Sequence, residues 1–135
     1  MDTTQIVWSV DDDDEMSEAV CLMLKLLGYK TRTFNDARSA AKALLGGELP
    51  LLMLLDVNMP EVSGLELLEF VRSRPILHDL PVLMLSANAT DTDVDLALKH
   101  GANGYLTKPV SYEELQAGIH SALSGINKDD INLKH

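Results

Sequence analysis

Short apolar runs alternate along this chain with longer segments in which apolar residues recur at helical spacing. The apolar runs predict strands over Gln5–Val10, Lys30–Phe34, Leu51–Leu55, Pro81–Leu85 and Gly104–Thr107. Helical spacing predicts a helix after each strand, over Met16–Leu27, Ala37–Leu45, Gly64–Ser73, Asp91–His100 and Ser111–Leu123. Regular alternation of strand and helix is typical of α/β proteins, so we expect a doubly wound, five-stranded parallel sheet with the common strand order 2-1-3-4-5.

Local signals mark where several of these helices begin and end. Gly28 follows the first helix, Asn35 can cap the second, and the segment from Ser111 to Glu114 matches a capping box for the last. The segment Asp91–His100 gives the weakest helical pattern, because Thr and Asp are poor helix formers. We expect this helix to be the most mobile of the set.

Length and charge limit the function classes. With 135 residues the chain has room for one domain, which we place over residues 1–125, followed by a polar tail over residues 126–135. The net charge of −10 disfavours direct binding to nucleic acid or to anionic membranes. Cys21 is the only cysteine, which excludes an internal disulfide. The sequence has no signal-peptide pattern and no apolar run near the roughly 18 residues of a membrane span, so we expect a cytoplasmic location.

Polar side chains follow the ends of four predicted strands. Asp11 and Asp12 follow the first, Asp56 the third, Ser86 the fourth and Lys108 the fifth. In doubly wound sheets these strand ends meet at one edge, where ligands bind. Three carboxylates about 5 Å apart would repel one another by about 3 kcal/mol per pair at an effective dielectric near 20, so they need a cation or a raised pKa. Oxygen ligands alone favour Mg²⁺ or Mn²⁺, and Mg²⁺ commonly binds together with a phosphoryl group.

The same motifs resemble the receiver domain of bacterial two-component response regulators, a domain similar to chemotaxis regulators. The resemblance covers about residues 5 to 124 and rests on four segments, Val10–Asp12, Leu55–Pro60, Leu85–Ala87 and Tyr105–Pro109. It implies a flavodoxin-like (βα)5 fold. It also implies a phosphoacceptor domain that receives a phosphoryl group from a sensor histidine kinase or a histidine phosphotransfer protein, and that is not an enzyme beyond its own phosphorylation and dephosphorylation.

The resemblance also implies the roles of the residues in the site. Asp56 resembles the phosphoacceptor. Asp11 and Asp12 resemble the acidic pair that holds the metal together with Asp56 and the backbone carbonyl of Asn58. Lys108 resembles the lysine that pairs with the phosphoryl oxygens, and in this family its bond to the following proline is often cis.

Two further residues resemble the family's switch, namely Ser86 and the aromatic Tyr105, which turns inward on activation. The switch would rearrange the face formed by the fourth helix, the fifth strand and the fifth helix, where a downstream protein or an output domain binds. Asn58 and Asn88 flank the position from which water would attack, so we expect them to set the lifetime of the phosphoryl group.

Two other classes of protein compete with this interpretation. A haloacid-dehalogenase-like phosphatase also uses an aspartate and Mg²⁺, but it needs a second aspartate where this chain has Asn58. A pseudo-receiver, which would be an interaction module without phosphorylation, is disfavoured because the phosphorylation residues are all present. The chain begins a few residues before its first strand, which slightly favours a single-domain regulator over a receiver attached to an output domain. Attachment to an output domain and phosphorylation-dependent dimerisation stay open.

Overall fold

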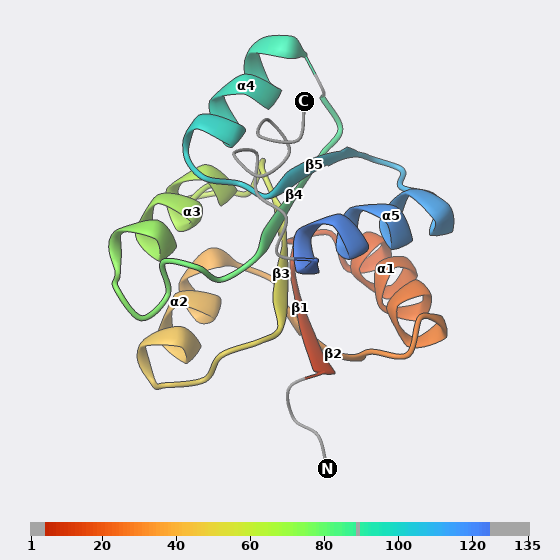
Figure 1. Ribbon diagram of the computed structural model, residues 1–135, viewed down its shortest axis with the longest axis horizontal. Coiled ribbons are helices and arrows are strands. Elements are labelled where there is room, and N and C mark those ends of the chain that lie inside the picture. Colours follow the sequence, from red (N-terminus) through yellow and green to blue (C-terminus); the bar gives the residue numbers. More distant parts are fainter. Residues whose placement is uncertain (1–4, 89, 125–135) are drawn as a thin grey trace.

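The computed structural model describes residues 5–88 and 90–124, and in these residues five parallel strands form one sheet (Figure 1). The strands are β1 (Ile6–Val10), β2 (Lys30–Phe34), β3 (Leu52–Asp56), β4 (Val82–Ser86) and β5 (Gly104–Thr107). Their order across the sheet is β2-β1-β3-β4-β5. The predicted doubly wound, flavodoxin-like fold and its strand order are therefore confirmed.

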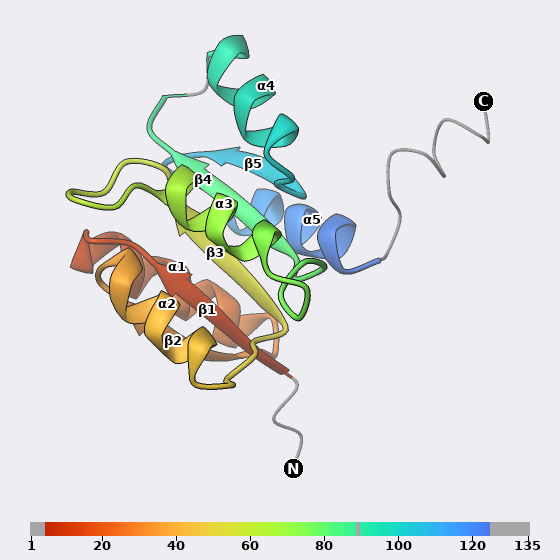
Figure 2. The ribbon, with the colours of Figure 1, turned by 90° about the vertical axis from the view of Figure 1, so that its left-hand side faces the viewer.

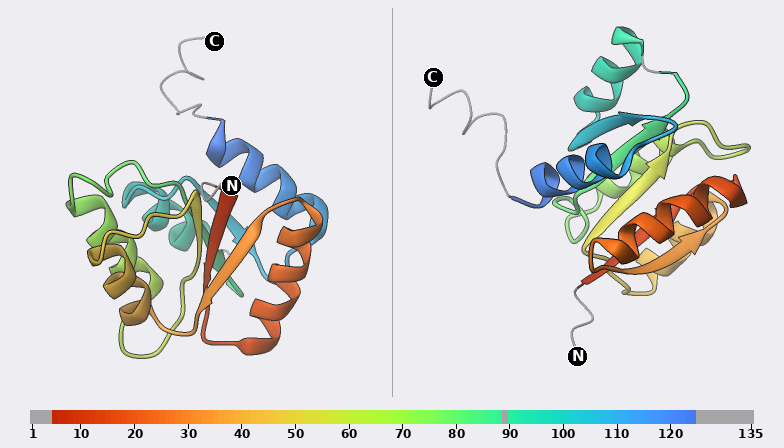
Figure 3. Two further views of the ribbon diagram at one scale, coloured as in Figure 1. Left: turned by 90° about the horizontal axis from the view of Figure 1, so that it is seen from below. Right: turned by 90° about the vertical axis from the view of Figure 1, so that its right-hand side faces the viewer.

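Helices cover both faces of the sheet (Figures 1 and 2). They are α1 (Asp14–Leu26), α2 (Ala37–Leu45), α3 (Gly64–Ser73), α4 (Asp91–Lys99) and α5 (Tyr112–Leu123). Helices α1 and α5 lie on one face, and α2, α3 and α4 lie on the other, as the two views of Figure 3 also show. Each face has its own apolar core. Val20 and Leu24 of α1 pack with Ile119 of α5 in one core, whereas Leu68 of α3 and Ala97 of α4 belong to the other.

The central strands explain why polar side chains meet at one edge. All residues of β3 and β4 are buried, which suits strands that are covered by helices on both faces. Asp56 and Ser86 are the last residues of these strands, one position further than the predicted strands extended. Parallel pairing places Asp56 opposite Leu85, so the two chain ends leave the sheet side by side. The apolar sequences of β3 and β4 thus bring a carboxylate and a hydroxyl to the same edge.

The helix caps match the caps predicted from the sequence only in part. Ser111 and Glu114 form the predicted capping box of α5. The predicted cap Asn35 is wrong, because α2 is capped by its neighbour Asp36, whose side chain accepts a hydrogen bond from the backbone N–H of Ser39. A second capping box, formed by Ser63 and Glu66 at the start of α3, was not predicted.

Helix α4 is the least buried of the helices on the described part of the chain. Ala97 is its only buried residue, which follows from the short apolar face that the sequence offers. The helix ends at Lys99, and His100 is its C-cap. The expected mobility of this helix stays a prediction.

No helix in the described ranges, residues 5–88 and 90–124, has both the length and the apolar character needed to cross a membrane. The predicted polar tail over residues 126–135 lies outside the described residues. The proposed division into a domain and a tail therefore stays a prediction.

The first residue of α3 allows no side chain. A Cβ atom at Gly64 would lie 2.0 Å from the backbone oxygen of Asp56, and the N–H of Gly64 donates a hydrogen bond to the carbonyl of Val57. This close approach holds the start of α3 against the loop that follows Asp56.

We therefore expect Gly64→Ala to lower the free energy of unfolding by about 1 to 3 kcal/mol, since the backbone of the loop must shift to make room. Urea unfolding followed by circular dichroism measures this loss. Gly46→Ala is the matched control, because its Cβ would make an ordinary contact of 3.4 Å with the carbonyl of Ala43. Equal effects of the two substitutions would contradict the prediction.

Candidate functional site

Three carboxylates gather where β1 and β3 end. Asp11 and Asp56 are buried, at 2% and 4% exposure, whereas Asp12 is exposed. Each offers a carboxylate oxygen, and these oxygens lie within 4.8 Å of one another. The structure therefore brings together the three carboxylates that the sequence predicted as a cluster.

Lys108 connects the two buried carboxylates. Its Nζ lies 3.0 Å from Oδ1 of Asp56, to which it donates a hydrogen bond, and 3.0 Å from Oδ2 of Asp11. Burial alone would lower the pKa of Lys108, but its contacts with Asp11 and Asp56 outweigh burial and raise the pKa overall. The lysine follows β5, its backbone N–H donates to the carbonyl of Ser86, and the Lys108–Pro109 bond is cis, as expected.

Burial dominates the ionisation of Asp56. Removal from water raises the pKa of Asp56, the hydrogen bond from Lys108 lowers it, the negative charge of Asp11 raises it, and the backbone N–H of Asn58 lowers it, with a net pKa of about 6. A carboxylate with a raised pKa beside a fixed lysine, at the edge of a sheet, has the properties of a functional group.

The donor set of this cluster fits a hard divalent cation. Oδ1 of Asp11 accepts a hydrogen bond from the N–H of Asp13, but Oδ2 is buried and accepts no hydrogen bond, although it forms an ion pair with Lys108. Asp11, the exposed carboxylate of Asp12 and Asp56 therefore offer oxygen ligands close enough together to hold one metal ion. The ligands are all oxygens, which suits Mg²⁺ or Mn²⁺.

Asp13 contributes more than solvated charge. Its side chain caps α1 by accepting hydrogen bonds from the N–H groups of Glu15 and Met16, at 3.0 and 3.2 Å, and its own N–H holds Asp11. The sequence predicts site roles for Asp11 and Asp12 but no role for Asp13. The signal for this cap was an aspartate directly before the first helical turn.

Ser86 and Tyr105 both bind the backbone of Asn88. The hydroxyl of buried Ser86 accepts a hydrogen bond of 3.0 Å from the N–H of Asn88, and the hydroxyl of Tyr105 donates one of 2.8 Å to its carbonyl. The ring of Tyr105 is half-buried and packs against the core beside α3 and α4. The two predicted switch residues thus share one partner in the loop between β4 and α4.

Comparison with known proteins identifies the class to which this fold and site belong. Residues 7–120 match the response regulator receiver domain. The chain is 39% identical over 114 residues to the transcriptional regulatory protein CpxR homolog of Haemophilus influenzae, which corresponds to 84% of this chain and 48% of that protein. It is 42% identical over 106 residues to an uncharacterized 14.6 kDa protein of Leptolyngbya boryana, covering 78% of this chain and 80% of that protein. The chain belongs to the response regulator receiver family.

Solved structures agree with this assignment. The chain is similar to the chemotaxis protein CheY4 of Vibrio cholerae, with a TM-score of 0.81, 30% identity, and coverage of 89% of this chain and 99% of that one. Receiver domains of this kind serve two-component and phosphorelay signalling, and response regulators are generally signalling proteins without enzymatic function. The chain spans about half the length of several curated relatives, from 47% to 51%.

The raised pKa of Asp56 predicts how stability depends on pH. The unfolded chain releases the proton of this carboxyl near its ordinary pKa of 3.8, whereas the folded protein holds it to about 6. Stability should therefore fall as the pH rises from about 4 to about 6 and stay reduced above that range. In Asp56→Asn this loss is absent, so we expect the variant to be more stable than the wild type by about 1 to 3 kcal/mol at pH 7 without divalent cations.

Urea unfolding between pH 4 and pH 7 measures the effect. Asp95→Asn, which removes an exposed carboxylate from α4, is the control and should leave the pH profile unchanged. A constant difference between wild type and Asp56→Asn across this range would contradict the prediction.

Proposed function

We propose that Asp56 accepts a phosphoryl group from a phosphohistidine of a sensor histidine kinase or a histidine phosphotransfer protein. The observation that carries this proposal is the contact of one lysine nitrogen with two buried carboxylates, at 3.0 Å from Asp56 and 3.0 Å from Asp11. Two such carboxylates and a lysine, with an exposed third carboxylate beside them, form a site suited to phosphoryl transfer. Membership of the receiver family supports the same function.

The transfer forms one bond and breaks another. A carboxylate oxygen of Asp56 attacks phosphorus in line, the P–N bond to the histidine breaks, and the imidazole leaves, which yields an acyl phosphate on Asp56. Lys108 is placed to neutralise charge on the phosphoryl oxygens. Asp11, Asp12, Asp56 and the backbone carbonyl of Asn58 would hold Mg²⁺ or Mn²⁺, which supplies further neutralisation of the same charge.

The switch follows from the new charge. A phosphoryl group on Asp56 adds strong acceptor oxygens at the edge of the sheet, beside the end of β4. We infer that the hydroxyl of Ser86 turns toward these oxygens, gives up the N–H of Asn88, and lets Tyr105 move inward. The face of α4, β5 and α5 would then change shape, and a downstream protein or an output domain would recognise this change as a shift between two states.

Asn58 and Asn88 would set how long the acyl phosphate lasts. Both residues are exposed and flank the site, Asn58 two positions after Asp56 and Asn88 two positions after Ser86. Water must pass them to reach the phosphorus. A phosphatase of the haloacid-dehalogenase type would need an acidic group at the position of Asn58. The amide of Asn58 cannot act as that acid, which favours a lasting acyl phosphate on Asp56 over repeated hydrolysis of a substrate.

A pseudo-receiver is the competing proposal, and the contacts of Lys108 argue against it. A receiver that had lost phosphorylation would not need a lysine held between two buried carboxylates, because burying charged groups costs stability. The partner is a protein surface or an attached domain. Several relatives are named transcriptional regulators, but the net charge of −10 makes the receiver itself a poor ligand for nucleic acid.

Phosphorylation can be tested without the natural kinase. We expect acetyl phosphate with Mg²⁺ to add one phosphoryl group to the wild type and none to Asp56→Asn, as measured by intact mass. Asp79→Asn, an exposed aspartate remote from the sheet edge, serves as the control and should be modified like the wild type. A modified Asp56→Asn protein would show that another residue is the acceptor.

The metal assignment makes a separate prediction. Mg²⁺ should stabilise the wild type against urea in proportion to the logarithm of its concentration. Asp12→Asn should weaken the apparent affinity by about tenfold or more, because it removes an exposed carboxylate ligand. Glu15→Gln removes one charge from the first turn of α1 without touching the cluster and should cause little change. Equal weakening by both substitutions would indicate general charge attraction and no metal site.

A further inference from the structure

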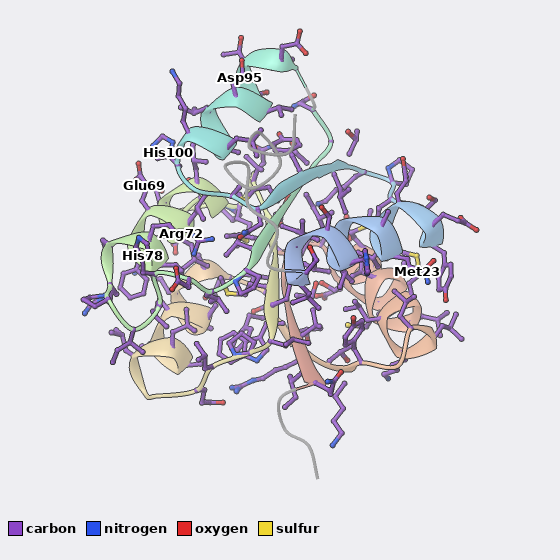
Figure 4. The ribbon with its side chains drawn as sticks, in the orientation of Figure 1. Met23, Glu69, Arg72, His78, Asp95 and His100 are labelled. Carbon is purple, nitrogen blue, oxygen red and sulfur yellow. The ribbon has the colours of Figure 1, made fainter. Side chains whose placement is uncertain are left out.

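The C-terminal end of α4 is fastened to α3 through His100. The ring nitrogen Nε2 of His100 lies 2.8 Å from Oε2 of Glu69 on α3, and Nδ1 lies 2.8 Å from the carbonyl of Leu96, one turn back on α4 (Figure 4). In its imidazolium form the ring donates at both ends, to a carboxylate and to a helix carbonyl. The ring is only 30% exposed, so this contact is partly shielded from water.

Arg72, one turn after Glu69 on the same helix, binds the residues that follow α4. Its Nε donates to the carbonyl of Gly101 at 2.9 Å and its Nη2 donates to Oδ1 of Asn103 at 2.9 Å. Nη1 donates to the carbonyl of His78 at 3.1 Å. Gly101 has a φ of +99°, and a Cβ there would lie 2.9 Å from Nε of Arg72. The turn after α4 is therefore shaped to receive this guanidinium group.

Asn103 extends these contacts into the sheet. The same Oδ1 atom that accepts from Arg72 also accepts a hydrogen bond of 2.8 Å from the N–H of Val82, the first residue of β4. The connection therefore reaches β4 at the end opposite to Ser86. Glu69, Arg72 and Asn103 together bind the C-terminal end of α4 to parts of the fold that lie away from the site of Asp56.

Among the described residues, the N-terminal end of α4 has no hydrogen bond or ion pair to α3. Its N-cap is Thr90, whose side-chain hydroxyl accepts a hydrogen bond from the N–H of Asp93 in the first turn of the helix itself. The loop that leads to it is held at Asn88, by the hydroxyls of Ser86 and Tyr105. Both of these hydroxyls belong to the proposed switch. One end of the helix is therefore tied to α3, and the other to residues that would respond to phosphorylation.

We infer that Glu69, Arg72 and Asn103 act as positioning residues that clamp the C-terminal end of α4, so that phosphorylation moves the N-terminal end of this helix about a fixed point near His100. The movement rests on the proposed function, whereas the clamp itself is a property of the unmodified protein. Release of Asn88 then changes the surface from Thr90 to Asp95 much more than the surface from Leu98 to Asn103.

Amide hydrogen exchange tests the clamp without any phosphoryl group. In the unmodified protein we expect the amides of His100, Gly101 and Ala102 to exchange more slowly than those of Val94, Asp95 and Leu96. Glu69→Gln and Arg72→Lys should speed exchange of the amides of residues 100–102. Glu69→Gln removes the negative charge that faces His100, and Arg72→Lys removes the planar guanidinium group that binds Gly101 and Asn103. Asp95→Asn, further up the same helix in Figure 4, is the control and should not speed exchange there. Equal exchange at both ends of the wild-type helix would overturn the inference.

Beryllofluoride with Mg²⁺ tests the movement. In the wild type, changes in amide chemical shift should be larger over residues 91–95 than over residues 98–103. Either clamp variant should spread the changes to residues 98–103, a redistribution that a general loss of stability would not produce. Uniform changes along the wild-type helix, or an unaltered distribution in both variants, would overturn the clamp. If beryllofluoride caused no change around Asp56, the proposed function would fail, and the hydrogen-exchange result would still decide the clamp.

Discussion

The ion pairs of Lys108 are the interaction on which the rest of the site depends. Two carboxylates, Asp11 and Asp56, are buried almost completely, and ionised groups in that position are costly unless an opposite charge lies close. Lys108 supplies this charge to both at 3.0 Å. The compensation is incomplete, because one lysine faces two buried carboxylates and burial still raises the pKa of Asp56 to about 6. The remaining deficit of positive charge favours a divalent cation.

Apolar side chains, a glycine and backbone hydrogen bonds position the charged groups of the site. The four fully buried apolar residues of β3, Leu52–Leu55, fix the direction in which Asp56 leaves the sheet. Gly64 lets α3 begin directly against the backbone of Asp56, which holds the loop that carries Asn58. The carbonyl of Ser86 holds the N–H of Lys108, so the strand that ends in the proposed switch also places the lysine. Asp56, the loop that carries Asn58, and Lys108 are therefore each positioned by apolar or backbone contacts.

The sequence predicted the strands, the helices and the edge at which polar residues meet, because short buried runs and helical spacing leave strong patterns. It predicted a wrong cap, since adjacent Asn35 and Asp36 are both good capping residues and only the path of the chain decides between them. The contacts of Glu69, Arg72 and Asn103 were invisible in sequence. They join residues from different elements, and no local pattern encodes such a pairing.

Asn88 lies in the loop before α4 and is bound by both proposed switch residues, Ser86 and Tyr105. Its N–H and carbonyl are bound by two hydroxyls, and no bond between side chains would be needed to transmit a change from Ser86 to Tyr105. A helix with only Ala97 buried has little packing energy to resist displacement. If both ends of α4 were equally loose, a change at Asn88 would disorder the helix. With one end bound to α3, the proposed change would instead produce a directed movement, and a partner protein would recognise the resulting surface.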